Sequence, residues 1–201
     1  MQHIEGFWWP DGSREEIRRL ILDTVVDAQS AIDYVKKRGV CVQAGGNVGC
    51  WPKWLSYQFD TVHTFEPEEA NWTCLQLNVS ESNVHRYKAA LGERQGKMGL
   101  RLSPKNIGAH RLEGAGDVKV MTIDSLALAA CDALFLDVEG YELPVLRGST
   151  RTLAKHHPVV MVEDRGLGVK TKNGGIGDIA RFLSGWGYKE RARVHFDVVF
   201  A

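Results

Sequence analysis

Short apolar runs alternate with segments of helical periodicity along most of this chain, and no other feature limits its fold as strongly. The apolar runs predict strands at residues 40–42, 62–65, 86–91, 118–123, 133–136 and 159–162. The periodic segments predict helices at residues 13–38, 52–59, 69–79, 144–155 and 176–186. Strands joined through helices form a mostly parallel sheet with helices on both faces, so an α/β fold is expected.

The chain end and one internal segment depart from this alternation. Residues 188–200 have no helix between their apolar runs, which predicts an antiparallel pair of strands. Residues 92–120 are rich in glycine, lysine and arginine, and we expect a hairpin or loop insertion there. Ser13 opens a capping box at the first helix, and Asp124 and Ser125 are expected to cap a short helix that follows them.

Length and composition suit one folded domain. The chain has 201 residues, of which 44% are hydrophobic and 25% charged, so a disordered chain is excluded. We expect a single domain over residues 1–201, with an N-terminal helical segment at 1–38 and a core at 39–201. Basic and acidic side chains number 25 each, and this balance argues against strong binding to nucleic acid or to an anionic membrane.

The cysteines and the hydropathy pattern bear on location. The four cysteines match no paired or zinc-binding spacing, which favours a reducing, cytoplasmic compartment. The N-terminal residues have no basic region followed by an apolar one, so no signal peptide is expected. No apolar run approaches the length of about 20 residues that a membrane span needs.

A glycine-rich turn directly follows the first predicted strand. Gly45, Gly46 and Gly49 stand in the sequence GGNVG, where the missing side chains permit a sharp bend and a close approach to a ligand. The pattern differs from GxGxxG, which binds a pyrophosphate, so a nucleoside without a diphosphate is favoured. The alternative is a turn that serves chain geometry alone.

Glu66 ends the second predicted strand, some twenty residues after the glycines. An acidic side chain at this place can accept hydrogen bonds from both hydroxyls of a ribose. The alternative is a surface glutamate before the turn at Pro67. The glycine turn and the acid together make the ribose interpretation the stronger one.

A third group of polar residues follows the buried 133–136 strand. Asp137 and Glu139 are placed to orient a substrate, to take a proton from a hydroxyl, or to hold a cation. Glu142 is interpreted instead as a cap of the next helix. No metal site is predicted, because the adjacent histidines at 156–157 have no partner at ligand spacing.

Five segments carry a resemblance to a known family. They are VQAGGNVG, FEPEEANWTCLQLN, TIDSL, LFLDVEGYELPVLRGS and PVVMVED. In this order they resemble the FkbM family of S-adenosylmethionine-dependent methyltransferases, over about residues 38–200. The resemblance implies a Rossmann-like class I methyltransferase: a seven-stranded, mostly parallel sheet whose last strand is antiparallel. It also implies S-adenosylmethionine as cofactor and O-methylation of a hydroxyl on a sugar, a glycan or a small natural product.

The resemblance also assigns a cofactor site. By position, the residues implied to bind S-adenosylmethionine are Gln43, Gly45, Gly46, Asn47, Gly49, Glu66, Ala89, Ala90 and Asp137. Glu66 would hold the ribose, and the two alanines would lie near the adenine. The family has an acid where this chain has Gln43, and an amide cannot offer a carboxylate to the ammonium of the cofactor. Asp137 is the residue that would compensate.

The reacting groups follow from the chemistry of methyl transfer to a hydroxyl. A nearby base assists by about 10²–10⁴-fold, and Asp137 is the first candidate, followed by Glu139 and Glu163. Asn106 is expected to contact the substrate. The tryptophans at 8, 9, 51 and 54 are interpreted as packing residues, although exposed indoles could stack on a sugar.

Two other functions stay open at this stage. The first is methylation of nucleic acid on the same fold, which the neutral charge and the lack of a recognisable RNA-binding module disfavour. The second is binding of S-adenosylmethionine without catalysis, which the amide at Gln43 keeps open. The fold alone does not decide among these functions.

Overall fold

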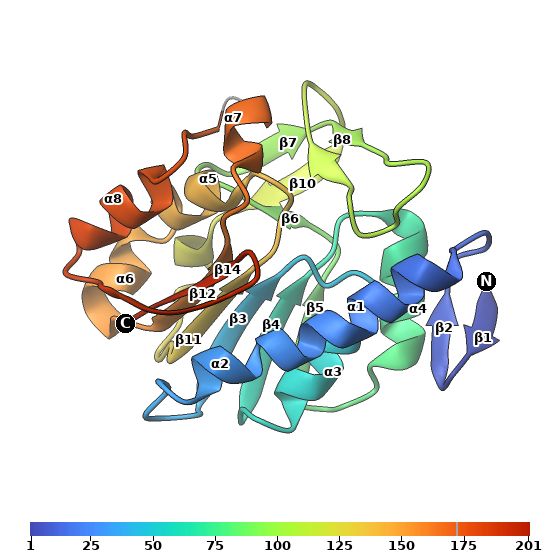
Figure 1. Ribbon diagram of the computed structural model, residues 1–201, viewed down its shortest axis with the longest axis horizontal. Coiled ribbons are helices and arrows are strands. Elements are labelled where there is room, and N and C mark those ends of the chain that lie inside the picture. The colour runs from blue at the N-terminus through green and yellow to red at the C-terminus, as the bar shows by residue number, and fades with distance from the viewer. Residues whose placement is uncertain (172) are drawn as a thin grey trace.

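The computed structural model describes residues 1–171 and 173–201, and its centre is a seven-stranded sheet (Figure 1). The strands are β3 (Val40–Ala44), β4 (Thr61–Phe65), β5 (Val84–Tyr87), β11 (Ala133–Leu136), β12 (Val159–Glu163), β13 (Glu190–Val194) and β14 (Asp197–Phe200). Their order across the sheet is β13-β14-β12-β11-β3-β4-β5. In this sheet β14 pairs antiparallel with both β12 and β13, and all the other pairs are parallel, which confirms the predicted topology. The chain order reverses between β3 and β11, and ligands of open α/β sheets bind at such a point.

Helices cover both faces of this sheet, as predicted. One face packs against α2 (Gln29–Ile32), α3 (Cys50–Ser56) and α4 (Glu69–Asn78), and the other packs against α5 (Glu142–Arg147), α6 (Thr150–His156) and α8 (Asp178–Ser184). Alternate residues of β11 join the two cores: Phe135 faces the first set of helices, and Leu134 faces the second. In the described part of the chain, no helix has both the length and the apolar character to cross a membrane.

The segment between β5 and β11 forms a small second layer above the carboxyl ends of the main strands (Figure 1). It contains a three-stranded sheet of β6 (Ala90–Leu91), β10 (Val118–Met121) and β7 (Gly96–Met98), and a hairpin of β8 (Leu100–Arg101) and β9 (Arg111–Leu112). The predicted insertion at 92–120 is therefore confirmed. The single strand predicted at 86–91 is wrong, because Ala89 N bonds to Tyr87 O and this turn takes the chain out of the main sheet.

A hairpin at the N-terminus was not predicted from the sequence. Its strands β1 (Gln2–Ile4) and β2 (Phe7–Trp9) are joined by two residues with positive φ, Glu5 and Gly6. The hairpin lies against α4, where the Asn78 side chain accepts from Trp8 N at 2.6 Å and donates to Trp8 O at 2.8 Å. Trp9 is buried beneath it.

The first predicted helix is shorter than expected. Instead of one helix over 13–38, α1 (Glu15–Asp27) and α2 are separated at Ala28, where Ala31 N bonds to Ala28 O in a tighter turn. The capping box is wrong as well. Arg14 is the N-cap residue and forms no side-chain cap, while the Ser13 hydroxyl accepts from the Gln2 side chain at 3.1 Å.

The helix predicted at 144–155 is also two helices, α5 and α6, which meet at Gly148. A Cβ atom on Gly148 would lie 2.1 Å from Gly92 O, so the chain packs there without a side chain. The helix bend follows from a contact between segments far apart in sequence. Such a contact leaves no local pattern for a prediction to use.

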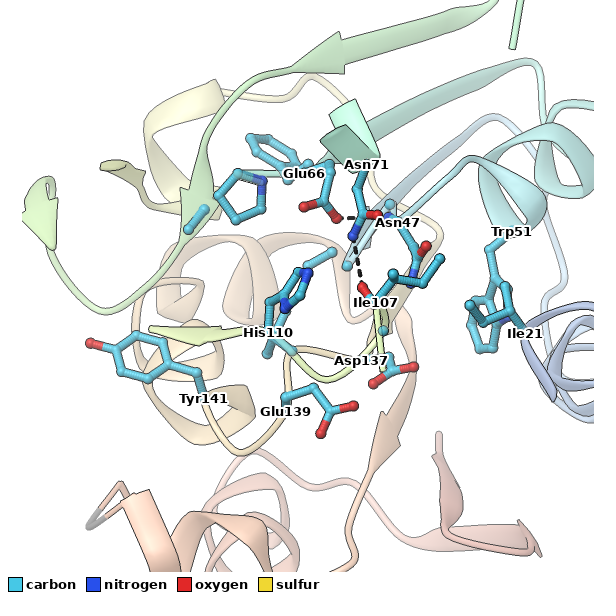
Figure 2. Close-up of a pocket in the computed structure, with 18 of the residues that line it drawn as sticks. Ile21, Asn47, Trp51, Glu66, Asn71, Ile107, His110, Asp137, Glu139 and Tyr141 are labelled. Carbon is cyan, nitrogen blue, oxygen red and sulfur yellow. Dashed lines mark hydrogen bonds between the residues drawn. The ribbon is translucent and has the colours of Figure 1, made fainter. Parts of the chain in front are cut away.

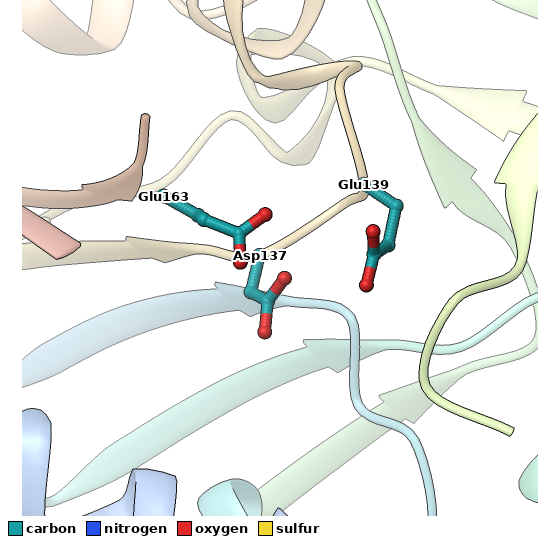
Figure 3. Close-up of side chains that lie close together, drawn as sticks. All are labelled: Asp137, Glu139 and Glu163. Atoms are coloured by element: carbon teal, nitrogen blue, oxygen red, sulfur yellow. The ribbon is translucent and has the colours of Figure 1, made fainter. Parts of the chain in front are cut away.

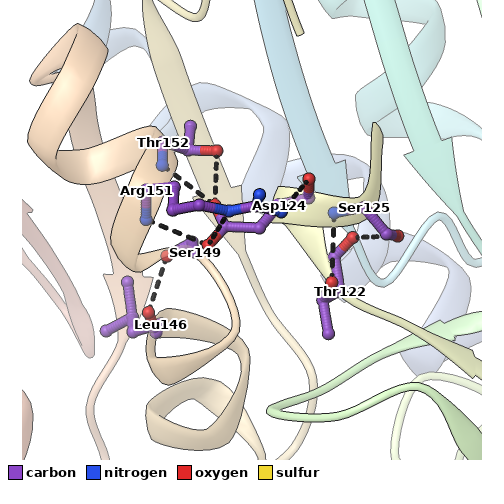
Figure 4. Close-up of polar contacts among 7 residues, drawn as sticks. All are labelled: Thr122, Asp124, Ser125, Leu146, Ser149, Arg151 and Thr152. Atoms are coloured by element: carbon purple, nitrogen blue, oxygen red, sulfur yellow. Dashed lines mark hydrogen bonds and ion pairs between the residues drawn. The ribbon is translucent and has the colours of Figure 1, made fainter. Parts of the chain in front are cut away.

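Asp124 caps a different helix from the one predicted (Figure 4). Thr122 caps the short 3₁₀ helix at Ile123–Leu126, through its side-chain oxygen and Ser125 N. The Asp124 carboxylate instead accepts from Arg151 N at 2.9 Å, and from Thr152 N and the Thr152 hydroxyl at 2.9 and 2.8 Å. It therefore satisfies free backbone amides in the first turn of α6.

Candidate active site

Strand register places the predicted site residues in one row. The last residues of β4, β3 and β11 pair with one another across the sheet, and the last residue of β11 also pairs with Val162 of β12. The next residue of each strand lies at the same sheet edge, in the order Glu66, Gly45, Asp137 and Glu163. Asp197 extends the row, because it pairs with Glu163 at the start of the reversed strand. Four carboxylates and one glycine thus meet where the strand order reverses.

The glycine turn packs too closely for side chains. Gly45 and Gly46 both donate their backbone N–H groups to Phe65 O, at 3.1 and 2.8 Å. A Cβ atom on Gly45 would lie 1.9 Å from Asp137 O, and one on Gly46 would lie 2.6 Å from a methyl carbon of Leu75. The turn therefore brings bare backbone next to Asp137.

Backbone amides hold Glu66 at the edge of this turn. One carboxylate oxygen accepts from Asn47 N at 2.7 Å and the other from Glu68 N at 2.8 Å. Burial raises the pKa of Glu66 to about 7, although both amide bonds act to lower it. Each oxygen keeps a lone pair for a further donor.

A cleft of about 1110 Å³, counting its open mouth, lies above this row (Figure 2). The predicted site residues that line it are Gly45, Gly46, Asn47, Glu66, Ala90, Asn106, Asp137 and Glu139. Four other predicted residues, Gln43, Gly49, Ala89 and Glu163, are not among its lining residues in the described chain. Glu163 lies next to Asp137 and borders a smaller neighbouring cavity.

Gln43 supports the turn from below instead of facing the cleft. Its side-chain oxygen accepts from the Thr64 hydroxyl at 2.5 Å, and its Nε2 donates to Ala44 O and Gly45 O at 3.2 and 2.8 Å. The residue is only 1% exposed. A carboxylate could not donate to these carbonyl groups, so the amide suits this position chemically.

Several cleft residues were not predicted from the sequence. They come from α1, α4, the second layer, the turn before α5 and the segment after β12, and they are Ile21, Thr24, Asn71, His110, Tyr141 and Arg165. The apolar stripe of the first predicted helix was a signal for Ile21, and Asn71 and Tyr141 lie in segments that carry the family resemblance, whereas no motif marked the others. Trp51, interpreted as a packing residue, lines the cleft too and donates from its indole nitrogen to the Thr24 hydroxyl at 3.1 Å.

The second layer is held against α4. Asn71 Nδ2 donates to Ile107 O at 2.8 Å (Figure 2). His110 accepts at Nδ1 from Ser103 N at 2.9 Å, and burial lowers the pKa of this histidine. The neutral ring therefore carries its proton on Nε2 and acts as a donor within the cleft.

Three carboxyl groups lie side by side at the other end of the cleft: Asp137, Glu139 and Glu163 (Figure 3). One oxygen of each lies within 4.8 Å of the others. Burial raises the pKa of Asp137, and burial together with the Asp137 charge raises the pKa of Glu139 to about 7. The same causes raise the pKa of Glu163, while its ion pair with Arg165 acts in the opposite sense.

The backbone after β11 forms a tight turn at Glu139. Glu139 has a φ of 55°, a left-handed conformation that costs non-glycine residues about 1–2 kcal/mol. The Glu142 carboxylate holds this turn by accepting from Val138 N at 3.1 Å and Gly140 N at 3.0 Å. The prediction that Glu142 caps the next helix is wrong, because its carboxylate binds the turn before α5 and no side chain caps the start of that helix in the described chain.

A family comparison decides what kind of protein this arrangement belongs to. The description "Methyltransferase FkbM domain" matches residues 43–190, which is most of the chain and includes every residue of the row except Asp197. The chain belongs to the FkbM methyltransferase family. No curated protein matches its sequence.

Solved structures agree with the FkbM-family fold. FkbM methyltransferase from Methylobacillus flagellatus KT has a TM-score of 0.54 and 17% identity, over 82% of this chain and 43% of that one. Precorrin-6y C5,15-methyltransferase from Geobacter metallireducens GS-15 has a TM-score of 0.53 and 15% identity, over 98% of this chain and 93% of that one. A putative methyltransferase from Streptococcus mutans, solved with SAH, has a TM-score of 0.51 and 13% identity, over 92% of this chain and 96% of that one. These proteins share the Rossmann-like class I methyltransferase fold with this FkbM-family chain.

Proposed function

We propose that this cleft binds S-adenosylmethionine and that the chain transfers the methyl group to a hydroxyl oxygen of a sugar, a glycan or a small natural product. One observation carries the proposal. The Glu66 carboxylate and the bare backbone of Gly45 and Gly46 face one cleft at the point where strand order reverses. This combination suits a nucleoside ligand that has no phosphate groups.

Different residues of the cleft suit the ribose, the adenine and the methionine part of the cofactor. The two oxygens of Glu66 each have room for a ribose hydroxyl, because each accepts only one backbone amide. Ala90 and Leu91 offer an apolar wall beside it that suits the adenine ring. The turn at Gly45 and Gly46 would lie against the methionine part, where no side chain takes up space.

Catalysis would depend mainly on positioning. The cofactor supplies an activated methyl group on a positively charged sulfur. In the transfer the acceptor oxygen would bond to the methyl carbon while the carbon–sulfur bond breaks with its electron pair left on sulfur, and a carboxylate of the chain would accept the hydroxyl proton. Asp137 and Glu139 line the cleft and are the acceptors we propose, and a pKa of about 7 suits Glu139 to this task at neutral pH.

The remaining walls bear on the acceptor. Apolar side chains of the second layer, Leu100, Ile107 and Leu112, line the cleft together with the phenol ring of Tyr141. Asn106 and His110 add polar groups among them. A mixed surface of this kind suits a sugar or a natural product with both apolar faces and hydroxyl groups.

We also propose that residues 1–201 work as one methyltransferase domain, since α1 from the N-terminal segment supplies Ile21 and Thr24 to the cleft. A cytoplasmic location remains our proposal. It is supported by four free and buried cysteines.

The test is a calorimetric titration with S-adenosylhomocysteine. Glu66→Ala should weaken binding by at least about tenfold, or about 1.4 kcal/mol, because charge-assisted hydrogen bonds to the ribose are lost. Glu69→Ala is the matched control, since Glu69 is exposed and pairs with Lys88 outside the cleft, and its affinity should stay that of the parent. Equal affinity in the parent and in Glu66→Ala would remove Glu66 from the site and with it the proposal.

A further inference from the structure

Among the side chains that the structure describes, few positive charges face the three carboxyl groups at the end of the cleft. Asp137, Glu139 and Glu163 lie within 4.8 Å of one another, and Arg165 forms an ion pair with Glu163. Arg111 adds a weaker attraction to Glu139. Like charges this close repel strongly in a partly buried place, so the ionised cluster needs a further cation.

A separate observation points to the same need. Glu163 is only 5% exposed, and its Oε2 atom is buried with no hydrogen-bond partner in the described chain. Its other oxygen is the one that pairs with Arg165. Buried polar atoms nearly always have a partner, so an atom of this kind next to two more carboxylates indicates a missing ligand.

The spacing suits a hard divalent cation. Carboxylate oxygens bind Mg²⁺ at about 2.0–2.1 Å and Ca²⁺ at about 2.3–2.6 Å, so two ligands on opposite sides of one ion lie at most about 4.2–5.2 Å apart. The three oxygens lie within 4.8 Å of one another, which is inside the reach of Ca²⁺, whereas Mg²⁺ requires them to move closer by up to about 0.6 Å. With one oxygen from each residue, a six-coordinate ion keeps about three positions for other ligands.

We propose that Asp137, Glu139 and Glu163 together bind one hard divalent cation, and that its open positions hold two neighbouring oxygen atoms of the acceptor. Each carboxylate binds the ion through one oxygen, so Asp137 or Glu139 keeps its other oxygen to accept the hydroxyl proton. Asp137 and Glu139 line the cleft, and Glu163 closes the site from behind. The second half of the proposal rests on the proposed methyl transfer. Binding of the acceptor to the ion would limit the acceptors to compounds with adjacent oxygen atoms, such as vicinal diols.

Binding of the metal alone tests the site. We would titrate the full chain with Mn²⁺ and follow the loss of the free-ion signal by electron paramagnetic resonance. The parent should bind one ion per chain, and Glu163→Gln and Glu139→Gln should each weaken binding by about tenfold or more. Asp117→Asn is the control, because Asp117 is exposed, pairs with Lys97 and is not among the described residues that line the cleft, and it should bind like the parent.

Two results would overturn the site: no bound Mn²⁺ at millimolar concentration, or equal binding in the parent and both glutamine variants. Titration of the same variants with S-adenosylhomocysteine separates this proposal from the previous one. Glu163→Gln should keep its affinity for that ligand, which shows that the variant is folded and that the cofactor cleft is intact. Transfer that is equally fast with a chelator present would contradict the role in acceptor binding.

Discussion

Gly45 shows how a single residue couples the turn to the rest of the site. It has a φ of 86°, and the space where a side chain would begin is taken by Asp137 O. A larger residue there would have to push away the strand end that carries Asp137. The glycine is therefore needed for packing and for access to the cleft at the same time.

We expect Gly45→Ala to destabilise the protein more than a glycine replacement elsewhere. Gly12→Ala is the matched control, since Gly12 also has a positive φ of 75° but nothing lies within 4 Å of its would-be Cβ. Both changes place an alanine in a left-handed backbone conformation, which destabilises the folded state. Gly45→Ala adds a steric clash that costs about 1–3 kcal/mol more. Urea unfolding measures the difference. Equal free energies of unfolding for the two variants would contradict the close contact.

Sequence patterns were informative for residues that strand ends position. Glu66, Gly45 and Asp137 were predicted together, and register brings them together, because each directly follows an apolar run. Gln43 shows the limit. Its place next to the turn was correct, but the direction of its side chain depends on Thr64, which lies on the neighbouring strand.

At the scale of helices and strands, Asp124 joins two distant elements. Its carboxylate binds backbone amides at the start of α6, while its own backbone belongs to the short 3₁₀ helix (Figure 4). This contact positions α6 on the sheet without any residue of α6 supplying the cap.

We expect Asp124→Ala to lower the free energy of unfolding by about 1–2 kcal/mol, as loss of a helix cap does. The side chain is also mostly buried, at 11% exposed, so water does not replace it easily. Asp117→Ala is the comparison, since an exposed aspartate should change stability by less than about 0.5 kcal/mol. Thermal or urea unfolding decides, and two variants of equal stability would rule out the capping role.

Element types were predicted better than element ends. The main strands were predicted from apolar runs, and the antiparallel pair at the end of the chain was predicted because no helical pattern separates its two apolar runs. The breaks at Ala28 and Gly148 were not predicted, because helical periodicity continues across both positions, and at Gly148 the cause is a contact with Gly92, which is distant in sequence. The N-terminal hairpin was missed because its strands are only three residues each, and their anchor, Asn78, lies in α4.

For the whole molecule, buried carboxyl groups should make stability depend on pH. Burial raises the pKa of Glu66 and of Glu142 from 4.5 to about 7 in each case. Between these values the folded chain holds protons that the unfolded chain has released, so stability falls as pH rises through this window. The half-buried His63, whose pKa is lowered to about 4, acts in the opposite direction: between about pH 4 and its ordinary pKa of 6.5, stability rises as pH rises.

We therefore expect the ligand-free protein to lose stability as pH rises from 6.5 toward and past 7, as followed by urea unfolding. Glu142→Gln should make this dependence shallower. Its amide oxygen can still accept from Val138 N and Gly140 N, but it has no proton to lose. A parent protein whose stability rises over the same interval would contradict the raised pKa values.

The row of residues at the sheet edge has one more consequence. Side chains of a strand alternate between faces, so a slip of β11 by a single position would swap the inward and outward sets along its length. Leu134 and Leu136 would leave their core, and Asp137 would no longer stand beside Gly45. Any alteration that misaligns the hydrophobic interior of this protein should therefore abolish its chemistry in the same step, and the two failures would be inseparable in an experiment.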